Sequence, residues 1–165
     1  MPKTQASLKD IRQLERMRQQ RIPSAFMDEN SHMNVQFYVH VAEQGLGEFL
    51  RRVGLGELYA AADKFGNFAL EQHIRYYAEI LTGDQVSVHA RLIDVSPKRC
   101  YVICFLINDT REQLAATVEV VMMNIDMTRR RGAPFPQEAK VALDILQARH
   151  RGLRWEAPVC GVMRA

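Results

Sequence analysis

Residues 28–34 read Asp-Glu-Asn-Ser-His-Met-Asn and gather acidic, amide and imidazole groups in one short stretch. The stretch comes directly before a long segment of helical periodicity, so we expect it to lie at a helix start. Unpaired N–H groups there can hold a carbonyl oxygen and stabilise the oxyanion formed when that carbonyl is attacked. A carboxylate beside them, such as Asp28, can attack the carbonyl or activate water. Thioester hydrolysis suits this arrangement because a thiolate leaves readily; an acidic turn that only caps the helix is the alternative.

The helix that must position this stretch is predicted over residues 34–53. Apolar and small residues recur there every four positions, in two adjacent rows that form one wide face. Ser31 or Asn34 is suited to cap its start. Two glycines inside the helix, Gly45 and Gly47, are unfavourable for helix formation and predict that another backbone packs very close to them.

Period-two alternation of apolar and polar residues after this helix predicts an antiparallel sheet. Four long strands are expected over residues 68–76, 86–93, 100–107 and 114–126. A first, edge-like strand is expected over residues 22–27, and further helices over residues 7–20 and 137–150. This order predicts an α+β fold in which the sheet wraps around the long helix.

The length of 165 residues fits one domain. We predict a single domain over residues 1–165. It would consist of an N-terminal helix (1–20), a core (21–127) and a C-terminal helix with a tail (128–165).

Five residues match the motif of a known family at its spacings. The motif is Asp-x-x-Gly-His-x-Asn, followed on the helix by Tyr and then Glu, and this chain supplies Asp28, His32, Asn34, Tyr38 and Glu43. The segment resembles the 4-hydroxybenzoyl-CoA thioesterase-like family, whose fold is the hotdog fold. A second stretch, Ile74-Arg75-Tyr76 followed by Gly83-Asp84, resembles the family's next strand and turn. The chain departs from the motif at Ser31, where only glycine takes a positive φ at little cost.

The resemblance covers roughly residues 20–127 and implies an acyl-CoA thioesterase. It implies that Asp28 is the catalytic carboxylate and that His32 and Asn34 shape the turn and the helix start. It also implies no separate cofactor, because coenzyme A is part of the substrate, and a homodimer or homotetramer with the ligand site between subunits. Whether Asp28 acts as a nucleophile or as a general base stays open at this point.

Residues 71–76 (Glu-Gln-His-Ile-Arg-Tyr) resemble a branch of the family that is linked to carnitine and betaine metabolism and hydrolyses betainyl-CoA. That branch implies a cationic acyl group, which aromatic rings can hold. Tyr38 and Tyr76 are therefore candidate substrate-binding residues, together with Glu71 and His73. The alternatives are core packing for the tyrosines and exposure on the outer face of the sheet for Glu71 and His73.

Three consecutive arginines, Arg129, Arg130 and Arg131, are candidates for holding the phosphates of coenzyme A, because guanidinium groups match phosphate oxygens. A solvated basic turn is the alternative. The net charge of the chain is +3, and residues 1–22 carry +4 (six basic and two acidic residues), which leaves −1 for the remainder. No nucleic-acid-binding motif accompanies these charges, so a nucleic-acid partner is not expected.

Composition and spacing disfavour several other classes of protein. The five histidines share no metal-ligand spacing, so we expect no metal site. No apolar run approaches the about 18 residues that a membrane span needs, and the first residues lack the features of a signal peptide. The three cysteines are an odd number without a Cys-x-x-Cys motif, which fits free thiols and predicts a cytoplasmic protein.

Two rival functions stay open within the hotdog fold. A hotdog enoyl-CoA hydratase has Asp-x-Asn-x-x-His, with the histidine five residues after the aspartate, whereas His32 follows Asp28 by four. The spacing therefore disfavours the hydratase. A non-catalytic acyl-CoA-binding module would bind the same esters without turnover, and only an experiment separates it from the enzyme.

Overall fold

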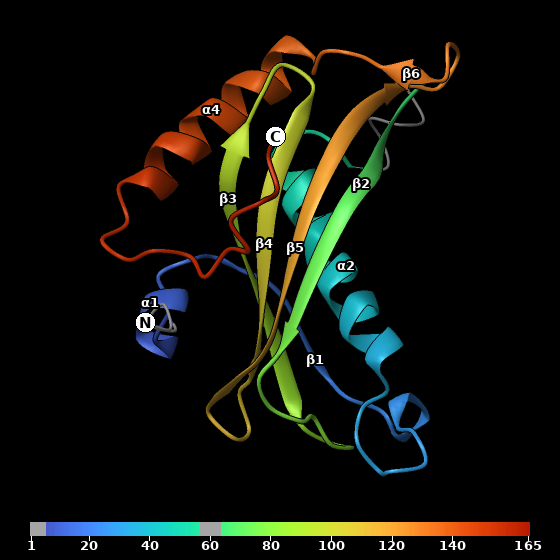
Figure 1. Cartoon of the computed structure of the whole chain (residues 1–165), viewed down its shortest axis with the longest axis vertical. Helices are drawn as coiled ribbons and strands as arrows, with labels where there is room; N and C mark the ends of the chain where they lie inside the picture. Colours follow the sequence, from blue (N-terminus) through green and yellow to red (C-terminus); the bar gives the residue numbers. More distant parts are fainter. Residues whose placement is uncertain (1–5, 57–63) are drawn as a thin grey trace.

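The structure, a computed structural model, describes residues 6–56 and 64–165 (Figure 1). Its antiparallel strands are β1 (Arg16–Arg21), β2 (Phe65–Tyr76), β3 (Gln85–Val95), β4 (Arg99–Asn108), β5 (Gln113–Asp126) and β6 (Arg131–Gly132). They form one sheet in the order β1-β3-β4-β5-β2, with β6 paired to β5. The helical elements are α1 (Leu8–Ile11), the 3-10 turn η1 (Ser24–Phe26), α2 (Val35–Arg52) and α4 (Gln137–Arg151).

The predicted architecture, an antiparallel sheet wrapped around one long helix, is confirmed, as are the four long strands and the C-terminal helix. Residues 57–63, between α2 and β2, lie outside the described residues. No helix within the described ranges is long and apolar enough to cross a membrane.

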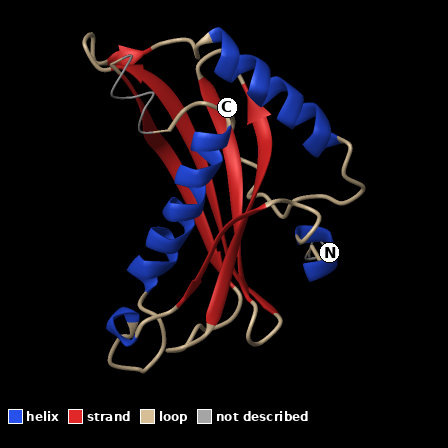
Figure 2. Ribbon diagram, turned by 180° about the vertical axis from the view of Figure 1, so that it is seen from behind, coloured by secondary structure: helices blue, strands red, loops and turns tan. Residues whose placement is uncertain are grey.

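Helix α2 lies in the curve of the sheet and is seen in front of it in Figure 2. Its buried side chains, such as Val41 and Phe49, share the main hydrophobic core with Val88 of β3. Gly45 lies so close to Val88 that a Cβ atom on it would be 2.5 Å from Val88 Cγ1. The prediction of close packing is therefore confirmed for Gly45 and wrong for Gly47, where a Cβ atom would meet nothing within 4 Å.

The N-terminal segment differs from the prediction. The helix expected over residues 7–20 has only four residues, and residues 16–21 form β1 along β3. Its start is as predicted, because Ser7 and Asp10 form a capping box. Residues 7–20 have too few apolar residues at helical spacing to bury one face of a longer helix, and pairing with β3 satisfies the backbone of β1 instead. The strand predicted over residues 22–27 is wrong as well, because those residues contain η1 and the edge position belongs to β1.

Both ends of the described chain cover the outer face of the sheet, the face opposite α2. Ile11 of α1 packs with Ile103 of β4. The C-terminal segment after α4 (residues 152–165) runs back across this face, as Figure 1 shows, and its Met163 packs with Val121 of β5. The sheet is therefore buried on both sides over much of β4 and β5.

The outer edge of β3 is covered in two parts. β1 pairs with its first half, and α4 lies beside its second half, where Leu92 N–H donates a hydrogen bond to His150 Nδ1 at 2.9 Å. Burial lowers the pKa of His150 to about 4, so the ring stays neutral and keeps its acceptor nitrogen. At the other end of the sheet, no described strand pairs with the outer edge of β2.

Candidate active site

The Asp28 turn (residues 28–33) joins η1 to α2 as a tight loop held by backbone hydrogen bonds. Asp28 N–H donates to His32 O at 2.9 Å, which closes the loop across its base. Met33 N–H donates to Ile80 O at 2.8 Å, which ties the loop to the segment between β2 and β3. These bonds fix the turn against the sheet, so its side chains are presented in a defined geometry.

Ser31 marks the point at which the chain departs from the family motif. Its φ is 66°, in the left-handed region that favours glycine. Ser31 N–H donates to Asp28 O at 3.1 Å, which holds this conformation. The serine therefore adopts the conformation that glycine would take at little cost, and the loop keeps its shape despite the substitution.

The Asp28 carboxylate is oriented by its own turn. Its Oδ1 accepts a hydrogen bond from Asn30 N–H at 2.8 Å, an Asx-turn bond that fixes the side chain. Its Oδ2 lies 3.4 Å from His32 Nδ1. The carboxylate is 20% exposed and the imidazole 41% exposed, so both groups can be reached by a ligand.

Helix α2 begins beside this carboxylate, as the sequence predicted. Asn34 is its N-cap, and Asn34 Oδ1 accepts a hydrogen bond from Gln36 N–H at 3.1 Å. Val35 N–H, at the first helical position, has no acceptor among the described residues, and Val35 is exposed. The turn therefore presents a carboxylate and a helix-terminal amide within the same short segment, which is a combination suited to attack on a carbonyl.

Tyr38 and Tyr76 lie together near this turn, and both were predicted to bind substrate. Their rings meet edge to face with centroids 5.1 Å apart. Tyr38 is buried and its hydroxyl donates to Ala78 O at 3.4 Å, whereas Tyr76 is half exposed. Burial raises the pKa of the Tyr38 hydroxyl, and the negative charge of Asp28 acts in the same direction.

Glu71 and His73, predicted to bind substrate with the tyrosines, lie away from them. Ile74 of the same strand packs into the core under α2, so the neighbouring His73 faces the outer side of the sheet. There His73 Nδ1 lies 2.9 Å from Glu119 Oε1 of β5. Glu71 is exposed on β2. The structure therefore brings Asp28 near the tyrosines and does not bring it near Glu71 or His73.

Glu119 is a polar residue that was not singled out from the sequence as a site candidate. Its side chain is completely buried and accepts hydrogen bonds from Tyr101 Oη and, at 3.0 Å, from Cys160 N–H. A glutamate inside the otherwise apolar run of residues 118–123 was the available signal. Such a residue requires polar partners, since an unpaired buried carboxylate is costly.

Of the three arginines at positions 129–131, Arg129 and Arg130 lie in the turn between β5 and β6, and Arg131 begins β6. Asp126, beside this turn, pairs with Phe65 at the start of β2, whereas Tyr76 ends β2 near the Asp28 turn. A strand of 12 residues spans about 36 Å, so these arginines lie at the opposite end of the same chain from Asp28. Within one subunit they therefore do not meet the candidate carboxylate.

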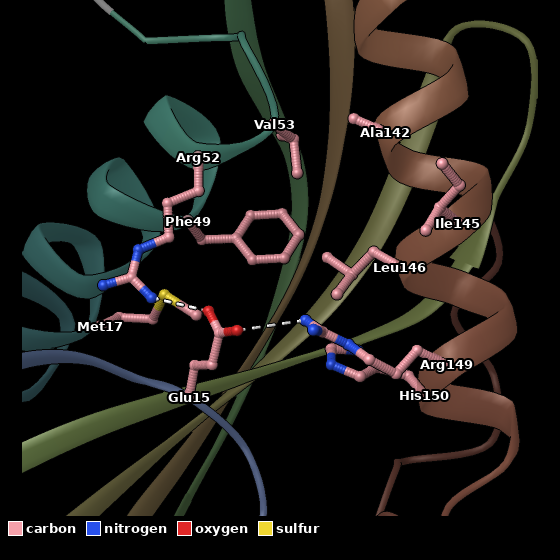
Figure 3. Close-up of a pocket in the computed structure, with 10 residues that line it drawn as sticks. All are labelled: Glu15, Met17, Phe49, Arg52, Val53, Ala142, Ile145, Leu146, Arg149 and His150. Carbon is pink, nitrogen blue, oxygen red and sulfur yellow. Dashed lines mark hydrogen bonds and ion pairs between the residues drawn. The ribbon is translucent and has the colours of Figure 1, made fainter.

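A cavity of about 360 Å³ lies between the C-terminal half of α2 and α4 (Figure 3). Phe49 and Leu146 line its apolar wall, and Glu15 at its rim pairs with Arg52 at 2.8 Å and with Arg149 at 3.4 Å. Helix α2 has 18 residues, about 27 Å, and Asp28 lies at its other end. This cavity is therefore separate from the Asp28 turn.

The sequence of this chain is similar to those of known thioesterases. The model of the thioesterase-like superfamily matches residues 22–143. The L-carnitine dehydrogenase/betainyl-CoA thioesterase of Agrobacterium fabrum is 28% identical over 137 residues, which are 83% of this chain and 28% of that protein. The betainyl-CoA thioesterase of Pseudomonas aeruginosa is 26% identical over 78% of this chain and 80% of its own length. The chain thus spans less than a third of the Agrobacterium protein and most of the Pseudomonas one.

Solved structures show the same arrangement of sheet and helix. A Staphylococcus aureus protein in complex with CoA superposes with a TM-score of 0.82 at 24% identity, covering 92% of this chain and 96% of that one. The 1,4-dihydroxy-2-naphthoyl-CoA thioesterase of Synechocystis superposes with a TM-score of 0.70 at 18% identity, covering 78% and 95%. With the family model matching about three quarters of its length, the chain belongs to the thioesterase-like superfamily and has the hotdog fold.

Proposed function

We propose that this protein is an acyl-CoA thioesterase that hydrolyses a small acyl-CoA ester to a free acid and coenzyme A. The observation that carries the proposal is the Asp28 carboxylate, held by Asn30 N–H at 2.8 Å and positioned beside the start of α2. The membership of the chain in the thioesterase-like superfamily supports it. No separate cofactor is part of this proposal, because coenzyme A enters with the substrate.

The residues of the Asp28 turn and of the start of α2 have distinct tasks in the proposed reaction. Val35 N–H donates to the thioester carbonyl oxygen and stabilises the oxyanion that develops on it. Asp28 either attacks the carbonyl carbon or removes a proton from the attacking water. His32 and Asn34 hold the turn and the helix start, and the thiolate of coenzyme A departs without a strong acid. In a single turnover in oxygen-18-labelled water, label found in the Asp28 carboxylate would show the nucleophilic route, and label found only in the acid product would favour the general-base route.

The acyl group that we propose is small and cationic, as in betainyl-CoA, on which two relatives are named to act. The edge-to-face pair of Tyr38 and Tyr76 supports this choice, since aromatic rings attract quaternary ammonium groups. Tyr76 is exposed in a single subunit, so one ring of the pair is available to a ligand.

We propose that the protein acts as a homodimer joined through the outer edge of β2. This edge exposes Phe68 and Leu70, and an open strand edge with apolar side chains is a surface for another chain. Antiparallel pairing of two β2 strands would place the start of one beside the end of the other. The Arg129–Arg131 turn of the partner subunit would then approach Asp28 and supply positive charge for the phosphates of coenzyme A.

We place the protein in the cytoplasm. Cys100, Cys104 and Cys160 are all free thiols, which fits a reducing compartment. The acyl-CoA esters proposed as substrates would be met there.

The test is release of free thiol from a panel of acyl-CoA esters that includes betainyl-CoA, short aliphatic and aromatic members, with binding of each ester measured in parallel. Turnover is expected on at least one member, with betainyl-CoA preferred over an uncharged ester of equal size. Binding without turnover on any member would contradict the proposal and favour an acyl-CoA-binding module.

A further inference from the structure

Three potential metal ligands from distant parts of the chain meet on the outer face of the sheet. His73 of β2 pairs directly with Glu119 of β5 in the sheet register, and Cys160 reaches them from the C-terminal segment. One ligand atom from each residue lies within 4.8 Å of the other two. No metal site was predicted from the sequence because the five histidines share no metal-ligand spacing, whereas the fold brings His73, Glu119 and Cys160 together.

A metal cation would stabilise the buried carboxylate of Glu119. Its side chain is completely buried, and among the described residues its only ion-pair partner is the imidazole of His73, at 2.9 Å. The other donors, Tyr101 Oη and Cys160 N–H, are neutral. A buried carboxylate without a fixed positive charge beside it is unfavourable, and a bound divalent cation supplies that charge.

The three ligand types select the metal. Imidazole nitrogen, thiolate and carboxylate together are typical of Zn²⁺, whereas Mg²⁺ and Ca²⁺ prefer oxygen ligands alone. Ligand atoms around a tetrahedral zinc are separated by about 3.3–3.7 Å, so the observed spacing requires only a small inward movement. The His73 side chain is 37% exposed, which gives a cation a route into the cluster.

We propose that His73, Glu119 and Cys160 bind a divalent transition metal of the zinc class, which fixes the C-terminal segment to β2 and β5. The segment is already held beside this cluster, because Arg75 donates to Pro158 O at 2.9 Å. The cluster lies on the outer face of the sheet, whereas α2 lies on the inner face. The site therefore has a structural task, and metal binding is independent of thioester hydrolysis.

The experiment uses the full chain after treatment with a chelator and its removal. Co²⁺ is titrated in while the thiolate-to-cobalt charge-transfer absorption is followed, and Zn²⁺ is then used to displace it. One cobalt per chain with a charge-transfer band is expected. His73→Gln is expected to weaken cobalt binding by about 10²-fold or more. Losing even a residue that only hydrogen-bonds to a metal ligand lowers metal affinity by about 10- to 100-fold.

Two cysteine substitutions test whether the charge-transfer band comes from cobalt bound at Cys160 or at another thiol. Cys160→Ser is expected to abolish the charge-transfer band, whereas Cys104→Ala, at a thiol buried in β4, is expected to leave it unchanged. Zn²⁺ is also expected to slow amide hydrogen exchange in residues 156–165 of the unsubstituted chain. Absence of cobalt binding, or binding with the same band and affinity in Cys160→Ser, would overturn the proposal.

Discussion

Asp28 with His32 and Glu119 with His73 are both carboxylate–histidine pairs with a partly exposed histidine, but their carboxylates differ in burial. The first pair is local, joins residues four apart and stays partly exposed, with 3.4 Å between its atoms. The second joins residues 46 apart, with Glu119 completely buried and 2.9 Å between the atoms. The exposed pair keeps hydrogen-bonding capacity for a ligand, whereas the buried carboxylate is enclosed by partners from the chain itself. Burial of the carboxylate, and not the residue types, therefore separates the site proposed for catalysis from the site proposed for a metal.

The largest expected effect comes from removing the buried carboxylate. Glu119→Ala leaves Tyr101 Oη and Cys160 N–H without their acceptor, and is expected to lower the free energy of unfolding by about 3 kcal/mol or more. Urea unfolding in the presence of a chelator measures this loss without any contribution from a metal. Glu29→Ala, at an exposed carboxylate of the Asp28 turn, is the control and is expected to change stability by less than about 0.5 kcal/mol. Equal losses of stability in the two variants would contradict the structural role of the buried Glu119 carboxylate.

The next prediction concerns the three arginines at positions 129–131, which lie near the start of β2 and far from Asp28 in the same subunit. Replacing Arg129, Arg130 and Arg131 together by alanine is expected to raise KM for the acyl-CoA ester by about tenfold, or 1.4 kcal/mol, with kcat little changed. The reason is the loss of charge that faces the phosphates from the partner subunit.

Mixed dimers sharpen this prediction. A dimer of one triple-alanine chain and one Asp28→Asn chain has one site with an intact Asp28 from the first chain and intact arginines from the second. The mixed dimer is therefore expected to hydrolyse the ester faster, at low ester concentration, than dimers of either variant alone. No gain over the separate variants would place the arginines and the carboxylate in the same subunit or show that they do not act together.

Another prediction concerns the pH dependence of stability that comes from His150, the buried histidine at the β3 edge. Burial lowers the pKa of His150 from its ordinary value of 6.5 to about 4, so the unfolded chain binds more protons between these values. Stability from this group is therefore complete above about pH 6.5 and falls with decreasing pH by at most about 1.4 kcal/mol per unit. Urea unfolding at several pH values checks the slope. His150→Asn is expected to flatten it, and an unchanged slope would contradict the assignment.

The smallest effect is expected at Ser31, where φ is 66°. Ser31→Gly relieves the left-handed conformation but makes the unfolded chain more flexible, so stability is expected to rise by only about 0.5 kcal/mol. Ser31→Val is the opposite change and is expected to destabilise the turn by more than about 1 kcal/mol. Thermal unfolding of both variants measures the difference, and equal stabilities would show that the turn is not held in this conformation.

The sequence predicted the parts of the molecule that local patterns control. The periodicity of residues 34–53 predicted α2, the cap at Asn34 was confirmed, and alternation predicted the four long strands. The predicted N-terminal helix was too long because residues 16–21 form β1. That strand forms by pairing with β3, and no local sequence pattern reveals this pairing.

Among the polar residues of the two proposed sites, the sequence likewise predicted the local contacts and missed those that depend on tertiary packing. Asp28, His32 and Asn34 lie within seven residues, so their proximity followed from the sequence alone. Glu119 and His73 meet only because β2 and β5 are neighbours in the sheet. Alternation along β2 could place His73 on one face, but the choice between the inner and the outer face depended on tertiary packing.

The catalytic role of Asp28 is tested by measuring kcat/KM for the preferred acyl-CoA ester in Asp28→Asn, with Glu29→Gln as the matched control in the same turn. Asp28→Asn is expected to lower kcat/KM by at least about 10²-fold while the melting temperature is kept, because a positioned base or nucleophile is lost. Glu29→Gln is expected to retain kcat/KM. A fully folded Asp28→Asn protein that hydrolyses the ester at the rate of the unsubstituted chain would contradict the assignment of Asp28.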